Sequence, residues 1–206
     1  MTPDIVLHVP PSQKACPGDQ GIRALPEDLR RGVAGHEPNL TPGWGQILIR
    51  ALFTLRIQAV ILFRLSQSGR GITTPLGVVI KYFNHALTGA DIASEASIGP
   101  GLIIWHPTGI VIGPGCRVGR GCTIMQGVTL GAGPNGRSAV AGSRPDWGGS
   151  PTLGDEVYVG PGAQVLGGIE IGAQARIGAN AVVLQDVPAR AFAAGVPAIV
   201  RPRDEL

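Results

Sequence analysis

The chain contains few charged and few aromatic residues. Of its 206 residues, 15% are charged and 4% are aromatic, so a core built on large rings is not expected. Lysine occurs only at Lys14 and Lys81, and the net charge of +3 is carried mostly by scattered arginines. Such a mild and dispersed charge argues against nucleic acid as a partner.

Cysteines and long apolar runs are also scarce. Three cysteines form no CxxC pair, and an odd count without a recognisable export signal predicts a reducing, cytoplasmic location. Arginines interrupt the most apolar segment, residues 44–65, so no membrane span is expected.

Glycine and proline, in contrast, are abundant. The chain has 32 glycines and 18 prolines, a share that in other proteins accompanies low complexity or disorder. However, 44% of the residues are hydrophobic, which is too apolar for a disordered chain. The glycines are therefore expected inside a folded domain with many tight corners.

The chain divides into regions of different character. A short helix is expected near residues 26–31, a longer one over 44–70 that ends at two glycines, and another over about 75–87. The expected regions are a loosely structured segment at 1–43, a helical region at 44–88, a repeat region at 89–190 and a C-terminal segment at 191–206.

The repeat region has a period of six residues. An aliphatic residue recurs at each sixth position, and another small or aliphatic residue follows four positions later. The later block comprises Leu153, Val159, Val165, Ile171, Ile177 and Val183; the earlier one comprises Ile92, Ile98, Ile104, Ile112, Val118, Ile124 and Leu130. The register shifts by two at His106–Gly109, and residues 131–152 interrupt the period with an extruded loop.

A period of six fits short strands joined by sharp corners, with three strands in each triangular coil. The aliphatic residues then point inward, glycine accepts the corner dihedral angles, and stacked coils pair as parallel strands. The pattern predicts a mainly β fold, a parallel β-helix preceded by a short α-helical region. Cys116 and Cys122 occupy the small interior position, so we interpret them as structural rather than reactive.

One histidine, His106, lies in the repeat region, at the place where the register shifts. Asp91 precedes it by fifteen residues, close to the length of one coil, which puts the two on adjacent coils about 4.8 Å apart. A carboxylate there could hold one imidazole nitrogen and leave the other free as a base. A corner histidine and a solvated aspartate are the structural alternative.

Several motifs resemble one enzyme family. They are Asp91–Ile92, HPTGIVIG at 106–113, GVTLG at 127–131, GPGAQVLGGIEIG at 160–172, IGANAVVLQDVP at 177–188 and AGVPA at 194–198. Over residues 88–200 the chain is similar to the serine acetyltransferases, which are hexapeptide-repeat acyltransferases with a left-handed parallel β-helix.

The resemblance implies direct attack of an acceptor hydroxyl on acetyl-CoA, with His106 as base, Asp91 as its orienting partner and backbone N–H groups near Gly131–Ala132 stabilising the oxyanion. It further implies a homotrimer with acetyl-CoA bound between subunits. The implied acetyl-CoA contacts are Gly131, Ala132, Pro161, Gly162 and Ala179, and Arg176, Arg201 and Arg203 are either phosphate ligands or solvated surface.

The chain departs from the family pattern where the family binds serine. Trp105 replaces the aspartate that precedes the histidine and contacts the amino group; it is either an apolar wall for the acceptor or a packing residue. Gly149 and Ser150 replace an Arg-His pair that grips the carboxylate, with Arg144 as a candidate substitute. Glu37 matches another family aspartate by loose alignment.

These observations together predict an acetyl-CoA-dependent O-acetyltransferase for a small-molecule hydroxyl. The alternatives are serine itself as acceptor in cysteine biosynthesis, or a sugar or natural-product hydroxyl or amine. A non-catalytic scaffold would not need both Asp91 and His106, and a metal enzyme of this fold would need several interfacial histidines. Since the chain ends RPRDEL soon after AGVPA, no complex with cysteine synthase is expected.

Overall fold

The computed structural model describes residues 21–35, 41–67, 75–133 and 149–202. A 3-10 helix, Gly21–Ala24, leads into four α-helices: α1 (Leu25–Ala34), α2 (Trp44–Phe53), α3 (Leu55–Ser66) and α4 (Pro75–Thr88). Fifteen strands follow in the described residues: β1 (Asp91–Ile92), β2 (Ser97–Ile98), β3 (Ile103–Ile104), β4 (Val111–Ile112), β5 (Arg117–Val118), β6 (Thr123–Ile124), β7 (Thr129–Gly131), β8 (Thr152–Leu153), β9 (Tyr158–Val159), β10 (Gln164–Leu166), β11 (Glu170–Ile171), β12 (Arg176–Ile177), β13 (Val182–Val183), β14 (Phe192–Gly195) and β15 (Ala198–Arg201).

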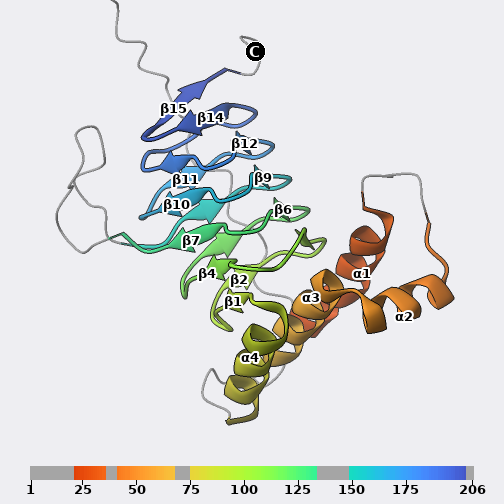
Figure 1. Ribbon diagram of the computed structural model, residues 1–206. Coiled ribbons are helices and arrows are strands. Elements are labelled where there is room, and N and C mark those ends of the chain that lie inside the picture. The colour runs from red at the N-terminus through yellow and green to blue at the C-terminus, as the bar shows by residue number, and fades with distance from the viewer. Residues whose placement is uncertain (1–20, 36–40, 68–74, 134–148, 203–206) are drawn as a thin grey trace, which may run out of the picture.

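The strands form a three-sided parallel β-helix. Sheet A has the order β1-β4-β7-β10-β13, sheet B has β11-β8-β5-β2, and sheet C has β15-β14-β12-β9-β6-β3. Strands β1 to β13 therefore visit the three sheets in turn, and each strand from β1 to β10 pairs with the strand three places further along the chain, whereas β12 pairs with β14. Figure 1 shows the coils stacked above the helices, with the antiparallel pair β14 and β15 at the opposite end of the stack.

The period of six predicted the interior correctly. Every aliphatic residue of the two repeat blocks is buried within one continuous core, from Ile92 at the first coil to Val183 near the last. Cys116 and Cys122 are fully buried free thiols within this core, as predicted. Stacking of short strands buries small aliphatic side chains efficiently, which is why the chain manages with few aromatic residues.

The repeat glycines serve two purposes, one of which was predicted. Glycines accept left-handed corner angles three residues after the aliphatic position, as at Gly121 and Gly162, although Gln174 and Asn180 do so too. The glycines directly after the aliphatic residues face the next coil instead. A β-carbon at Gly160 would lie 2.8 Å from the Ile177 carbonyl oxygen, so glycine is needed there for close stacking rather than for φ.

The helix expected over residues 44–70 is two helices. Thr54 adopts an extended conformation (φ −120°, ψ 107°) between α2 and α3, which bend by 91°. The apolar pattern continues through Thr54, so periodicity alone does not reveal the break. Among the described residues no single helix has the length and apolar character of a membrane span, although the bent pair α2 and α3 meets that criterion when taken together.

A buried ion pair joins the helices to the first coil. Arg64 Nε on α3 donates to Asp28 Oδ2 on α1 at 2.8 Å, and both side chains are inaccessible to solvent. Asp28 Oδ1 also accepts the backbone N–H groups of Gly101 and Leu102, while the Arg64 guanidinium donates to carbonyls of the preceding turn. Burial raises the pKa of Asp28, and the charge of Arg64 opposes this rise.

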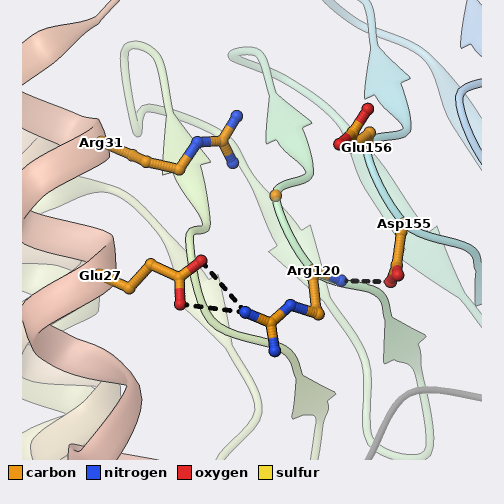
Figure 2. A pocket seen from close by; sticks show the side chains of 6 residues that line it. Glu27, Arg31, Arg120, Asp155 and Glu156 are labelled. Atoms are coloured by element: carbon orange, nitrogen blue, oxygen red, sulfur yellow. Dashed lines mark hydrogen bonds and ion pairs between the residues drawn. The ribbon is translucent and has the colours of Figure 1, made fainter. Parts of the chain in front are cut away.

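We call the line of corners between sheets B and C the B–C edge; it comprises residues 99–102, 119–122, 154–157 and 172–175. Helix α1 covers its beginning. Figure 2 shows the polar pocket between them, where Glu27 Oε2 lies 3.3 Å from Arg120 Nη2 and Asp155 accepts the Arg120 N–H. Arg31 donates to the Gly101 carbonyl at the same place. This pocket consists of paired charges that attach α1 to the β-helix.

Candidate functional site

The corners between sheets C and A form a second edge, the C–A edge, which comprises residues 105–110, 125–128, 160–163 and 178–181. Backbone hydrogen bonds connect its coils in sequence: Gly127 N–H to Thr108 O (3.1 Å), Gly162 N–H to Gln126 O (2.8 Å) and Asn180 N–H to Pro161 O (2.8 Å). Residues far apart in the sequence therefore lie in one line. His106 is at the start of this line.

His106 lies in the corner where the register of the repeat shifts. Its φ of 53° is in the left-handed region, and its side chain is exposed. Within the described residues its imidazole has no hydrogen-bond partner. The long corner thus presents the ring to solvent instead of packing it, which leaves both ring nitrogens available to a ligand.

Asp91 lies on β1, whose neighbour β4 begins directly after the His106 corner. The Asp91 N–H donates to the Ile110 carbonyl at 2.8 Å, which places the two candidate catalytic residues on adjacent coils. The Asp91 carboxylate pairs with Lys81 Nζ of α4 at 3.1 Å, not with His106. Both partners are partly exposed, so this ion pair contributes little stability and leaves the carboxylate able to change partner.

Three of the residues expected to contact acetyl-CoA lie on the C–A edge. Pro161 and Gly162 form the corner before β10, and Ala179 lies in the corner of the next coil. Gly131 and Ala132 lie at the C-terminal end of strand β7, on the side of sheet A away from the C–A edge. A strand of this length spans about 10 Å. The expected acetyl-CoA residues thus frame one face of the β-helix next to the His106 edge.

Gln126 is a residue that the sequence reasoning missed. It occupies the C–A edge one coil after His106, and its Oε1 atom is buried without a hydrogen-bond partner in the described part of the chain. A buried amide oxygen without a donor costs free energy, so such an atom marks a place where a ligand N–H could bind. Its position in the coil register, directly after the His106 corner, is the signal that could have identified it.

Trp105 contacts its own chain. The Arg56 guanidinium carbon of α3 lies 4.0 Å from the centroid of the indole, and a β-carbon at Gly35 would be 3.4 Å from the other end of the ring. The indole is half-buried. Arg56 was not predicted as a site residue, because nothing in the local sequence relates it to a residue 49 positions away.

The other candidates are dispersed. Arg176 and Arg201 are exposed on sheet C and lie on either side of Phe192 in register, so they share one face. Ser150 lies at the A–B corner, where its hydroxyl donates to the Pro114 carbonyl at 2.8 Å, and the structure does not bring it to the His106 edge. Arg144, Glu37 and Arg203 lie outside the described residues.

Comparison with known proteins gives a consistent result. Residues 150–185 match the family model of the bacterial transferase hexapeptide (six repeats). By sequence, no curated protein matches the chain. The fold matches the soybean serine acetyltransferase apoenzyme with a TM-score of 0.68 and 32% identity, over 89% of this chain and 70% of that one.

Two further structures extend this comparison. A serine acetyltransferase in complex with CoA matches with a TM-score of 0.71 and 31% identity, over 87% of this chain and 69% of that chain. The enzyme from Neisseria gonorrhoeae matches with a TM-score of 0.69 and 30% identity, over 89% of this chain and 66% of that one.

These matches confirm the expected left-handed parallel β-helix behind a short helical region, and they extend beyond the β-helix into the helices, since they cover nearly nine-tenths of the chain. With 32% identity over most of both proteins, the chain belongs to the serine acetyltransferase family of hexapeptide-repeat acyltransferases.

Proposed function

We propose that this acyltransferase transfers the acetyl group of acetyl-CoA to a hydroxyl of a small molecule at the C–A edge, with His106 as the general base. One observation carries the proposal: His106, with no partner among the described residues, shares an edge with Pro161, Gly162 and Ala179, the positions expected to contact acetyl-CoA. A free base beside a row of backbone groups fits direct acyl transfer, which needs no covalent enzyme intermediate.

In the proposed reaction His106 accepts the proton of the acceptor hydroxyl while that oxygen attacks the thioester carbonyl. Because Gly131 and Ala132 lie a strand length away from the C–A edge of their own chain, we assign the donation to the oxyanion to the backbone N–H groups near these positions in a neighbouring subunit. When the carbon–sulfur bond breaks, the His106 imidazolium returns the proton to the departing thiolate. Asp91, on the adjacent coil, orients the ring after it leaves Lys81.

The chain's own residues fit acetyl-CoA along the same face. The unpaired Oε1 atom of Gln126 suits an amide N–H of the pantetheine arm, since that arm carries two such donors. Arg176 and Arg201, exposed and in neighbouring register on sheet C, suit the phosphates at the far end.

The acceptor is the part of the proposed reaction that differs most from the reaction of the serine acetyltransferases. A soybean relative has been solved in complex with serine, and serine remains one candidate for this chain. Trp105 stands where the resemblance implies a carboxylate for an ammonium group, and Gly149 and Ser150 stand where it implies an Arg-His pair for a carboxylate. We therefore propose a hydroxyl compound other than free serine, such as a modified amino acid, a sugar or a natural product.

We also propose a homotrimer with sites between subunits. Large apolar side chains are exposed on α2 and α4, with Trp44 at 80%, Phe53 at 83% and Leu76 at 68% exposure. Such exposed apolar surface suits contact with other copies of the chain. Light scattering coupled to size-exclusion chromatography should give the mass of three chains, and a monomer at micromolar concentration would contradict this.

A thiol-release assay with acetyl-CoA tests the activity. Serine, homoserine, sugars and hydroxylated metabolites serve as the acceptor panel, and product masses identify the acetylated group. Release that depends on an acceptor and on His106 is the expected result. Efficient turnover of serine would contradict the altered acceptor, whereas full activity without His106 would contradict the mechanism.

A further inference from the structure

The side chain of Arg56 contacts the residue that directly precedes the candidate catalytic histidine. Its guanidinium stacks on Trp105 at 4.0 Å, and Trp105 directly precedes His106 in the chain. Consecutive Cα atoms lie about 3.8 Å apart, so Arg56 stacks on a residue that adjoins the candidate base in the chain. Both α1 and α3 contact β3, the strand that ends just before Trp105, which holds this arrangement in place.

The guanidinium is incompletely satisfied. Its Nη1 atom is buried, and no hydrogen-bond acceptor reaches it from the described residues. Burial lowers the pKa of Arg56 from its ordinary value, and the charge of Arg50 lowers it further. Arg50 itself donates to the Val33 carbonyl at 2.9 Å, so this second cation adds positive potential without supplying an acceptor.

A buried donor atom without an acceptor costs free energy, and the neighbouring positive charge of Arg50 adds to that cost. No ion pair of Arg56 or Arg50 with a carboxylate occurs in the parts of the chain that the structure describes. Arg64, which is fully buried, pairs in contrast with the Asp28 carboxylate and with backbone carbonyls. The difference indicates that Arg56 is prepared for an anion that arrives with a ligand.

We propose that Arg56 binds an oxyanion of the acceptor, so that the enzyme acetylates hydroxyl compounds that carry a carboxylate or phosphate group near the hydroxyl. This inference rests on the proposed acetyl transfer and makes it more specific. Guanidinium groups bind carboxylate and phosphate oxygens through charge-assisted hydrogen bonds, and stacking on Trp105 fixes the plane of the donors. Arg56 is then the residue that selects the acceptor.

Matched pairs of probes test the proposal. Glycerate is compared with glyceramide, and glycerol 3-phosphate with glycerol, by calorimetric titration and by thiol release from acetyl-CoA. In the wild-type chain the charged member of at least one pair should bind at least about tenfold more tightly, the value of one charge-assisted hydrogen bond. The pair that shows this preference distinguishes carboxylate from phosphate.

The variant Arg56→Gln should remove the preference mainly through KM and leave the neutral probes unchanged, whereas Arg56→Lys should keep part of it. Arg117→Gln, an exposed arginine on sheet B, is the matched control and should behave as wild type. Equal binding of charged and neutral probes, or no binding of either charged probe, overturns the proposal, and so does an Arg56→Gln chain that retains the preference.

Failure of this inference differs from failure of the proposed function. If the wild-type chain acetylates neutral probes as well as charged ones and needs His106 to do so, the function stands and the role of Arg56 falls. If charged probes bind through Arg56 but His106 is dispensable for thiol release, the role of Arg56 in binding stands and the proposed mechanism falls. Should Arg56→Gln fail to fold, the wild-type comparison within each pair decides alone.

Discussion

The B–C edge and the C–A edge are made by the same repeat, yet their polar groups differ. At the B–C edge Arg64, Arg31 and Arg120 all have partners on α1 or on the first coils, and α1 covers part of the edge. At the C–A edge His106 has no partner among the described residues, and buried atoms of Gln126 and Arg56 lack hydrogen bonds there.

The comparison separates stability from function within one scaffold. Repeated coils provide equivalent corners, so a difference in polar satisfaction does not follow from the fold itself. Buried polar atoms without partners are expected where a ligand completes the hydrogen bonds, and fully paired ones where the groups hold elements together. We therefore interpret the B–C edge as structural and the C–A edge as the reaction site.

The largest expected effect concerns His106. The variant His106→Asn keeps a residue that tolerates the left-handed conformation, so the fold should persist while the base is lost. Thiol release should fall by about 10²–10⁴-fold, the usual contribution of a general base. Gln174→Asn replaces another left-handed residue, at the B–C edge, and should keep full activity; equal losses in both variants would mean that the edges do not differ.

The next effect concerns the buried ion pair. Arg64→Met leaves Asp28 buried without its cation and should lower the free energy of unfolding by about 3–5 kcal/mol, measured by urea denaturation. Arg120→Met, which removes the exposed pair with Glu27, should cost at most about 1 kcal/mol. Similar losses in both would contradict the importance of burial.

The same variant has a defined pH dependence. Burial already raises the pKa of Asp28, and without Arg64 it should rise further, so protonation of Asp28 is favoured in the folded state. Its contribution to stability is then present at low pH and is lost as the pH rises through the folded-state pKa. The deficit of Arg64→Met relative to wild type should therefore shrink as the pH is lowered; a deficit independent of pH would contradict this.

A smaller effect on stability and on KM is expected from substitutions at two glycines with similar φ angles. Gly162 at the C–A edge has φ of 69° and Gly121 at the B–C edge has φ of 65°. Alanine at either position should destabilise the fold by about 1 kcal/mol. Its β-carbon would meet the Asn180 amide at the first site and Arg31 Nη1 at the second, 2.9 Å away. Only Gly162→Ala should also raise the KM for acetyl-CoA, and parallel changes in KM would undo the distinction.

The smallest effect concerns the interior thiols. Burial raises the pKa of the Cys116 thiol, so little thiolate forms in the folded chain. In a Cys16→Ser background, Cys116 and Cys122 should resist an aromatic disulfide reagent at pH 8 and react fully in urea. Rapid labelling of the folded chain would contradict their structural role.

The repeat was the most predictable feature because its signal is local and multiplied over many coils. Each aliphatic residue obeys the same constraint, so the period placed all of them in the core correctly. The break at Thr54 was not predictable, since the apolar pattern runs through it and the bend depends on how α2 and α3 pack. The second purpose of the repeat glycines, which is close stacking directly after the aliphatic residues, was missed because it is a contact between residues distant in sequence.

The sequence by itself determined the scaffold, the family and the histidine on which the proposed chemistry depends. A period of six specifies strand, corner and interior at every step, and the shift in register at His106 is visible as a break in that period. Only the tertiary structure decided which groups meet at the reaction edge. Arg56 reaches Trp105 because α3 folds back on the first coil, and such a contact leaves no trace in local periodicity.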